Sequence, residues 1–174
     1  MALVVFLKGV NVGGHRRVRP SLLAKQLKRF DVASIGAAGT FIVRKAVAVT
    51  DLRREILGRL PFDAEVIVCR GGEILRLVRD DPFDGEARRR DIVSFVGVMA
   101  TRRRASSSVP RTLPAEGEWC VRVLARRSRF VLGRYRRRMK TISCLGQLEK
   151  ALGTPLAIRN WTTILAVGKL LTRR

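Results

Sequence analysis

The stretch Ala2-Leu-Val-Val-Phe-Leu7 is an unbroken run of apolar residues, and a glycine-rich segment from Gly9 to Gly14 follows it almost directly. A strand with one face in water alternates apolar and polar residues, whereas a strand buried on both faces is apolar throughout. Residues 2–7 are therefore predicted to form a central strand that is covered on both faces. The glycines that follow predict a turn where the chain leaves the sheet.

Helical and extended patterns alternate along the rest of the first half. Pro20 suits the first turn of a helix, and Leu23, Leu27 and Phe30 repeat at helical spacing behind it. The order strand, helix, strand, strand, helix, strand is that of a ferredoxin-like split βαβ lobe, which is predicted for residues 1–84. The strands after the first are predicted at 32–35, 40–44 and 65–69, and the later helices between Thr50 and Pro61 and around 74–78.

The second half predicts a smaller α+β lobe over residues 85–174. Its strands are expected to run antiparallel, and two helices are expected at its C-terminal end. The whole prediction is an α+β fold in which the ferredoxin-like lobe packs on this second lobe, which then covers the free face of the central strand. The strands are predicted at 91–99, 119–125 and 130–132, and the helices near 145–152 and from Asn160 to about Leu171.

The chain is strongly basic, and the excess charge lies mostly in its second half. Its 174 residues contain 36 lysines and arginines against 14 aspartates and glutamates, a net charge of +22 at pH 7. Residues 88–174 hold 21 of the basic and 4 of the acidic residues. This difference predicts two structural units with different surfaces. Arginine outnumbers lysine 29 to 7, which suits bidentate phosphate contacts but also follows from a genome-wide codon bias.

Composition also narrows the class of protein. No apolar run reaches the roughly 20 residues of a membrane-spanning helix, so no membrane partner is expected. Cys69, Cys120 and Cys144 lie far apart, which argues against a disulfide framework or a cysteine metal site and favours a cytoplasmic location. His15 is the single histidine. We therefore assign no catalytic residue, metal or cofactor, and an enzyme is the less favoured class.

The glycine loop, residues 9–17, is the first candidate binding site. Glycines permit positive φ angles and consecutive N–H groups that bind an anion, and basic side chains stand beside them. The loop lacks the G-x-G-x-x-G and P-loop patterns, so a structural turn is the competing interpretation. A helix N-terminus beside Arg159 would attract anions as well. The predicted residues of a small-anion or nucleotide site are Gly9, Asn11, Gly13, Gly14, His15, Arg16, Arg17, Arg159 and Asn160.

Arginine clusters in the second half are the second candidate site. If the predicted strands form a meander, residues 88–90 and 126–129 fall at one end of the sheet, and residues 102–104 and 134–140 at the other. Basic residues at both ends suit a phosphate backbone that crosses the sheet. A solvated basic surface is the competing interpretation. The predicted polyanion-binding residues are Arg88, Arg89, Arg90, Arg102, Arg103, Arg104, Arg126, Arg127, Arg136, Arg137 and Arg138.

Three segments resemble, in order, those of the bacterial domain of unknown function 1697 family. Residues 7–14, Leu-Lys-Gly-Val-Asn-Val-Gly-Gly, are similar to its opening LRGINVGG signature. Residues 65–83 are similar to its middle segment, and residues 149–163 to its closing pattern with Arg-Asn-Trp-x-Thr. The chain departs from the family at residues 38–40, where Ser-Gly-Asn is usual, and at Ala157, where threonine is frequent. The resemblance implies an α+β protein with a ferredoxin-like lobe, and it implies no function because the family is uncharacterised.

These observations favour a binding protein. The leading hypothesis is that it binds nucleic acid or another polyanion through the arginine clusters, and such contacts would be electrostatic and poorly sequence-specific. The alternative is a small anionic ligand or nucleotide bound at the glycine loop. Assembly through exposed strand edges is a further alternative, and the oligomeric state is left open.

Overall fold

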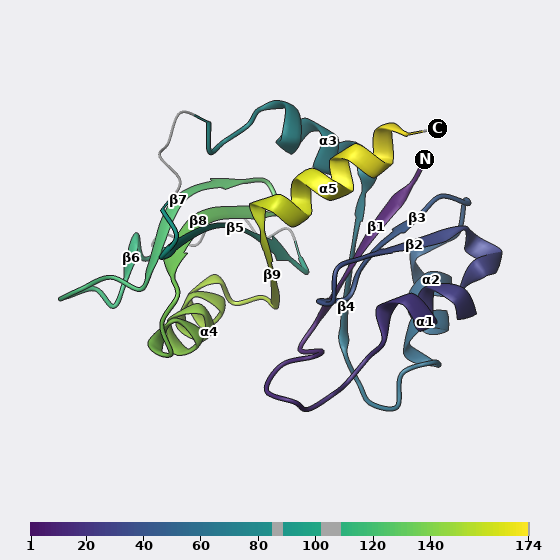
Figure 1. The fold of residues 1–174 in the computed structure, drawn as a ribbon, viewed down its shortest axis with the longest axis horizontal. Coiled ribbons are helices and arrows are strands. Elements are labelled where there is room, and N and C mark those ends of the chain that lie inside the picture. The colour runs from purple at the N-terminus through teal and green to yellow at the C-terminus, as the bar shows by residue number, and fades with distance from the viewer. Residues whose placement is uncertain (85–88, 102–108, 174) are drawn as a thin grey trace. The chain divides into compact units, whose positions relative to one another are not determined.

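The computed structural model describes residues 1–84, 89–101 and 109–173 (Figure 1). In these residues the protein has a mixed α+β fold with two antiparallel sheets and five α-helices, which confirms the predicted class. The chain divides into two compact units, Met1–Asp80 with Thr162–Arg174, and Asp81–Trp161. This division differs from the predicted boundary at residue 84, because the last helix groups with the first unit.

The first strand is central in the four-stranded sheet of the first unit. The strand order is β2-β3-β1-β4, and Val5 of β1 lies opposite both Phe41 and Val68 in antiparallel pairs. Residues 4–7 are at most 1% exposed, so the prediction of a central strand buried on both faces is confirmed. The strands are β1 (Leu3–Lys8), β2 (Val32–Ile35), β3 (Thr40–Val43) and β4 (Glu65–Arg70).

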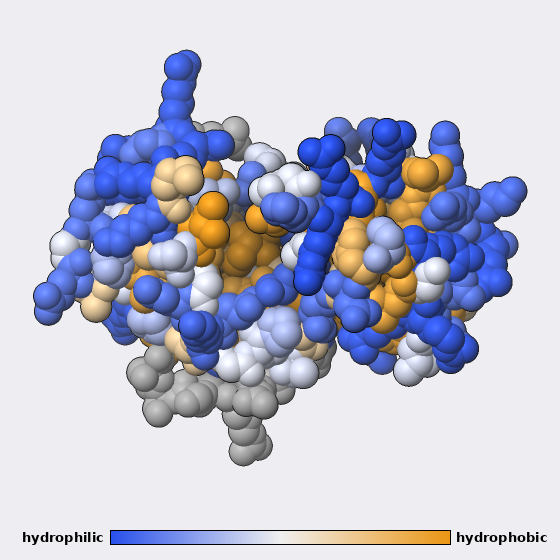
Figure 2. All heavy atoms as spheres, turned by 90° about the horizontal axis from the view of Figure 1, so that it is seen from below, coloured by the Kyte–Doolittle hydropathy of each residue, from blue (hydrophilic) through white to orange (hydrophobic). Residues whose placement is uncertain are grey.

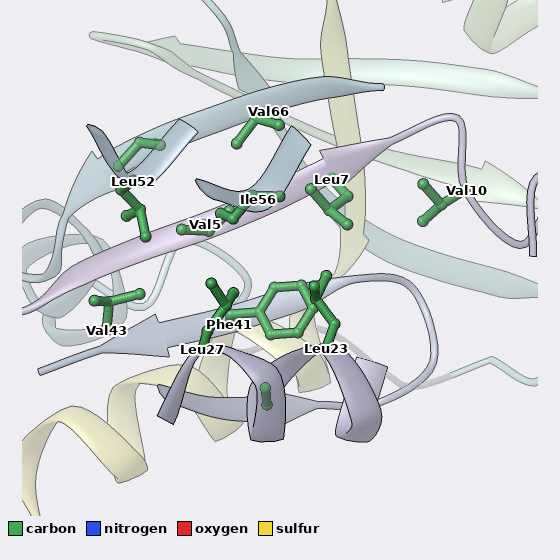
Figure 3. Close-up of a cluster of buried hydrophobic side chains, with 12 residues drawn as sticks. Val5, Leu7, Val10, Leu23, Leu27, Phe41, Val43, Leu52, Ile56 and Val66 are labelled. Atoms are coloured by element: carbon green, nitrogen blue, oxygen red, sulfur yellow. The ribbon is translucent and has the colours of Figure 1, made fainter. Parts of the chain in front are cut away.

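Two helices pack their apolar sides on one face of this sheet (Figure 3). Leu23 and Leu27 from the region of α1, and Leu52 and Ile56 from α2, share one buried cluster with Val5. The helical spacing seen in the sequence is therefore the spacing of the residues that enter this core. The elements are α1 (Pro20–Gln26), which a 3-10 turn at Lys28–Phe30 follows, and α2 (Val49–Leu57).

Two further helices of the first unit, α3 (Gly71–Arg79) and α5 (Trp161–Thr172), lie against each other. A Cβ atom on Gly168 would lie 3.1 Å from the side chain of Val78, and one on Gly71 would lie 3.0 Å from that of Leu171. The C-terminal end of the chain thus completes the first unit. None of the helices in the described parts of the chain is long and apolar enough to cross a membrane.

The second unit is built on a five-stranded antiparallel sheet with the order β6-β7-β8-β5-β9. One face packs on α4 (Lys140–Leu152), where Phe95, Val121 and Val131 meet Cys144 and Leu148. The strands β6 and β9 were not predicted, because β6 has two residues and β9 lies directly before α5. The strands are β5 (Ile92–Met99), β6 (Thr112–Leu113), β7 (Val121–Arg127), β8 (Phe130–Arg136) and β9 (Leu156–Asn160).

The two compact units have equal formal charge, although the two halves of the sequence differ. Each unit contains 18 basic and 7 acidic residues of the full sequence. The reason is that the C-terminal segment brings three basic residues to the first unit, while residues 81–86 bring three acidic residues to the second. Hydrophilic side chains accordingly cover much of the face of each unit that Figure 2 shows. The uneven charge is a local feature within the second unit.

Candidate functional site

The glycine loop is held closed by the side chain of Asn11. Its amide nitrogen donates hydrogen bonds to the carbonyl oxygens of Val18 (2.9 Å) and Ala37 (2.7 Å). Its Oδ1 atom accepts one from the N–H of Val18 (2.7 Å), and its own N–H donates to the carbonyl of Arg16 (3.1 Å). An asparagine side chain has two donor hydrogens. Both serve the backbone here, so Asn11 has a structural role in the loop.

The tip of the loop is a two-residue turn. Gly13 (φ +60°) and Gly14 (φ +76°) separate Val12 from His15, whose N–H donates to the Val12 carbonyl (3.2 Å). Positive φ at both central residues is the requirement of a type I′ turn, and glycine meets it without strain. The turn itself therefore accounts for these two glycines. Val12 (61% exposed) and the imidazole of His15 project into solvent.

The two arginines of the loop also contact its own unit. The Nε atom of Arg17 donates to the Gly14 carbonyl (3.1 Å). The guanidinium of Arg16 lies 3.4 Å from the Asp63 carbonyl oxygen and 5.9 Å from the ring centroid of Phe62. The structure thus brings seven of the predicted small-anion residues together in one loop.

The remaining two predicted residues of that site, Arg159 and Asn160, belong to the second unit. Arg159 is 6% exposed and donates a hydrogen bond to the carbonyl of Ile158 (2.8 Å). Burial lowers the pKa of its guanidinium to about 10, so it is a cation at neutral pH. The Asn160 Oδ1 atom accepts a hydrogen bond from the hydroxyl of Tyr135 (2.9 Å).

The register of the second sheet overturns the predicted grouping of the arginine clusters. β5 and β8 are antiparallel neighbours, with Ile92 opposite Arg136 and Val98 opposite Phe130. The start of β5, with Arg89 and Arg90 before it, therefore lies at the same end of the sheet as residues 136–138. Residues 126 and 127 lie at the other end. The meander predicted from the sequence would place β5 beside β7, whereas in the structure β8 lies between them.

The structure describes seven of the eleven predicted polyanion-binding residues, and these differ in their exposure. Arg88, Arg102, Arg103 and Arg104 are outside the described residues. Arg89 forms an exposed ion pair with Asp91 (3.1 Å). Arg90, Arg127, Arg137 and Arg138 are exposed, and Arg126 and Arg136 are half-buried.

Trp119 contacts two arginines at the end of the sheet where β7 begins. The guanidinium carbons of Arg122 and Arg136 each lie 4.5 Å from the centroid of its ring. Such cation–π contacts stabilise by about 0.5–1 kcal/mol at exposed sites and by more when the cation is desolvated. The Arg136 side chain is 18% exposed, and its Nε atom is buried without a hydrogen-bond partner in the described residues. The indole ring therefore holds two cations close together.

Glu118 supplies a carboxylate to the same cluster. It accepts hydrogen bonds from Arg136 and from Arg138, whose second terminal nitrogen lies 2.8 Å from Oε1. The hydrogen bond from Arg138, followed by the charges of both arginines, holds the pKa of Glu118 below its ordinary value of 4.5. Residues 118–140, which we call the arginine hairpin because they contain β7 and β8, include nine basic residues and this one acidic residue. Glu118 thus neutralises a small part of the local charge.

A cross-strand row extends the cluster along the sheet. Arg122 lies directly opposite Arg134, and Arg134 lies directly opposite Ser94. Directly opposite residues point to the same face, and so do residues two apart in one strand, so Arg136 shares this face with Arg122 and Arg134. It is the face away from α4, because the intervening Val121, Val123 and Tyr135 pack with that helix. Like charges placed directly opposite each other destabilise an antiparallel pair.

Sequence reasoning missed Glu118, Trp119 and Arg122, and it placed Arg134 at one end of the sheet without including it among the predicted binding residues. The prediction selected runs of consecutive arginines, but consecutive residues of a strand point to opposite faces. The informative signal was an alternation, Arg134 and Arg136 in one strand and Arg122 in its neighbour, with tryptophan at the strand start. Within the described ranges, no three His, Cys, Asp or Glu side chains gather as a metal site requires.

Comparisons with known proteins identify a family and a similar fold. A family model described as "Protein of unknown function (DUF1697)" matches residues 1–118. The solved structure of the conserved bacterial protein SP0830 from Streptococcus pneumoniae is similar over 98% of both chains, with a TM-score of 0.59 and 13% sequence identity. At this identity the likeness shows the fold alone. No protein with curated functional information matches the sequence significantly. The family match includes the glycine loop, whereas nearly all of the arginine hairpin lies beyond it.

Proposed function

Because this chain belongs to the DUF1697 family, whose description assigns no function, its function has to be inferred from its own residues, and we propose that it binds nucleic acid through the arginine hairpin. The observation that carries the proposal is that residues 118–140 contain nine basic residues and only one acidic residue. We propose a binding protein rather than an enzyme, because the chain contains a single histidine and that side chain is exposed in the glycine loop.

The physical argument is one of charge neutralisation. Arg122 and Arg134 oppose each other across two strands, so each lies in the repulsive field of the other. A phosphate bound between such cations replaces repulsion with attraction and releases the counterions that the nucleic acid had condensed. The planar guanidinium also bonds bidentately to phosphate oxygens, which a lysine ammonium does not. Nucleic acid offers a continuous row of phosphates for such contacts, and contacts of this kind carry little sequence information.

Fluorescence anisotropy on labelled random-sequence DNA and RNA, titrated across salt concentration, tests the proposal. The test variant replaces Arg122, Arg134 and Arg138 together by glutamine, three arginines at the same end of the sheet. Its matched control replaces three basic residues of the first unit, Lys25, Lys28 and Arg76, which are exposed. We expect affinity to fall at least about tenfold in the test variant, with a log–log salt slope shallower by about 3 on duplex DNA.

The control separates a specific surface from overall charge. Both variants lose three positive charges, so equal losses of affinity would show that net charge alone attracts the nucleic acid and would overturn the proposal. Weak binding of the unchanged protein at physiological salt would overturn it as well. Heparin of equal total charge is added as a competitor of the nucleic acid. If it competes equally well, and if the test variant loses the same affinity for heparin as for nucleic acid, the surface binds polyanions generally.

The alternative function, a small anionic ligand or nucleotide at the glycine loop, stays a prediction. Thermal unfolding in the presence of phosphorylated metabolites tests it, because a ligand at a hundredfold excess over its Kd stabilises the folded state by about 2.7 kcal/mol. Absence of any shift across such a panel would remove this alternative.

We also propose that the first unit is a ferredoxin-like βαββαβ lobe. The proposal is supported by the order β2-β3-β1-β4, by antiparallel pairing of all neighbours, and by the shared core of α1 and α2. A cytoplasmic location is proposed on the three cysteines, which are buried and unpaired by disulfides.

A further inference from the structure

Trp119 and the two arginines over its ring are the group of side chains that the proposed function does not yet use. We propose that Trp119, Arg122 and Arg136 form a stacking surface for the bases of single-stranded nucleic acid, with Glu118 holding the place of a phosphate until the strand binds. This inference rests on the proposed function and names its substrate class.

The stacking step follows from the chemistry of the three side chains. Unstacked bases are recognised by aromatic rings and by arginine guanidinium planes. Both types occur here within 4.5 Å of one ring centroid. The ring also restricts the rotamers of Arg122 and Arg136 before any ligand arrives, which lowers the entropy lost on binding. Trp119 therefore contacts the bases and positions the cations beside them.

Glu118 marks where the phosphate binds. Its carboxylate accepts hydrogen bonds from both Arg136 and Arg138, and at 55% side-chain exposure it stands at the surface. Carboxylate and phosphate oxygens are alike as acceptors for guanidinium donors. A phosphodiester can replace the carboxylate on both arginines while its neighbouring base meets the ring. Glu118 is thus a competitor of the ligand, and its removal is expected to strengthen binding.

The geometry favours a single strand over a duplex. Arg122 lies near the start of β7 and Arg136 at the end of β8, so both stand at one end of a sheet and not on a helix that enters a groove. Bases of a duplex are stacked on each other and offer no free face. Single strands combine accessible bases with a flexible backbone, and proteins bind them with aromatic side chains along a basic surface.

The experiment uses the two tryptophans of the chain. In the variant Trp161→Leu, Trp119 is the single tryptophan, so its emission reports on this surface alone. Three probes of equal total charge are added: a mixed-sequence single-stranded oligonucleotide, the corresponding duplex, and inorganic polyphosphate, which has phosphates without bases. We expect the single strand to quench the Trp119 emission and to shift its maximum. Polyphosphate is expected to change the emission little.

Affinities in the parent protein then test each side chain. Trp119→Leu is expected to lower single-strand affinity about tenfold while leaving polyphosphate affinity within twofold. Trp119→Phe, which keeps a ring, is expected to recover most of the loss. Glu118→Gln is expected to raise affinity for all three probes about threefold and to steepen the salt slope by about 1, because one more phosphate contact forms. Circular dichroism checks that each variant is folded.

Two results overturn the inference and leave the proposed function intact. One is unchanged single-strand binding in Trp119→Leu while the triple variant of Arg122, Arg134 and Arg138 loses affinity. The other is an equal loss for the single strand and polyphosphate in Trp119→Leu, which would reduce the ring to a support for the cations. Failure of the parent protein to bind any of the three probes overturns the proposed function itself.

Discussion

The glycine loop and the arginine hairpin both gather basic residues beside a distinctive motif, yet their polar groups are used in different ways. In the loop, the Asn11 side chain forms three hydrogen bonds to backbone atoms, and both loop arginines contact backbone carbonyls. In the hairpin, the sequence contains nine basic residues and one acidic residue, and Arg122 faces Arg134 across the sheet. The loop uses these polar groups for its own hydrogen bonds, whereas the hairpin contains far more basic than acidic residues.

This difference separates a motif that builds structure from a surface that can bind a ligand. A conspicuous sequence such as Asn-Val-Gly-Gly is explained when its turn and hydrogen bonds are known, because type I′ geometry requires residues that tolerate positive φ. An excess of like charge has no such internal explanation, since repulsion lowers stability. The hairpin is therefore the stronger site candidate, although the glycine loop was the more visible motif in the sequence.

The largest expected effect comes from a glycine that supports the hairpin. A Cβ atom on Gly133 would lie 2.5 Å from the Arg122 carbonyl oxygen and 2.7 Å from the ring of Phe95, which is fully buried. Neither neighbour can move without disturbing the sheet. We expect Gly133→Ala to lower the free energy of unfolding by about 3 kcal/mol. Urea unfolding followed by tryptophan fluorescence measures it, since both tryptophans lie in the second unit.

The control for this prediction is Gly146→Ala. Gly146 lies within α4, and a Cβ atom there would meet nothing within 4 Å apart from the helix's own backbone. Alanine is the better helix former, so this variant should be more stable by up to about 1 kcal/mol. Similar changes in the two variants would contradict the close approach of β8 to β7 and Phe95.

A smaller effect is expected at the centre of the loop. Asn11→Ala removes three hydrogen bonds to exposed backbone groups, and we expect the free energy of unfolding to fall by about 2 kcal/mol. Thermal unfolding followed by circular dichroism measures the change. His15→Ala, which alters an exposed side chain in the same loop, should shift stability by less than about 0.5 kcal/mol. An unchanged stability of Asn11→Ala, together with the loss of a metabolite-induced melting shift, would reverse the comparison.

The smallest effect concerns the acidic residue of the hairpin. Because the pKa of Glu118 is lowered in the folded protein, its carboxylate contributes stability above its ordinary value of 4.5. That contribution is lost as the pH falls through the lowered pKa. We expect the unfolding midpoint of the parent to fall more steeply than that of Glu118→Gln between pH 6 and about pH 3. Parallel curves would show that the ion pairs with Arg136 and Arg138 add no stability.

Local patterns in the sequence predicted most of the individual elements. The unbroken apolar run at residues 2–7 identified the central strand, and Pro20 stands at the first residue of α1 as predicted. β6 and β9 were missed, because a pair of residues has no periodicity and Leu156–Asn160 leads into α5 without an intervening turn residue. What identifies β9 as a strand is its pairing with β5, which lies about sixty residues earlier in the chain.

The binding surface required information of another kind. The sequence showed where arginines cluster, but it predicted the wrong neighbours for β5, and therefore grouped residues 88–90 with 126–129. It also contained Trp119 and Arg122 three residues apart without indicating that Arg136 reaches the same ring. That contact depends on the register of β7 against β8 and on the bulge between Val123 and Ala125.

Composition and periodicity alone established the α+β class, the central first strand and the strongly basic character of this protein. These properties arise from residues close in sequence, since backbone geometry sets a period of 2 for strands and 3.6 for helices. The assignment of α5 to the first unit, the strand order of the second sheet and the meeting of Trp119 with two arginines came from the folded chain. They depend on which distant segments pack together, and the energy of that packing is shared among many residues that no local pattern reveals.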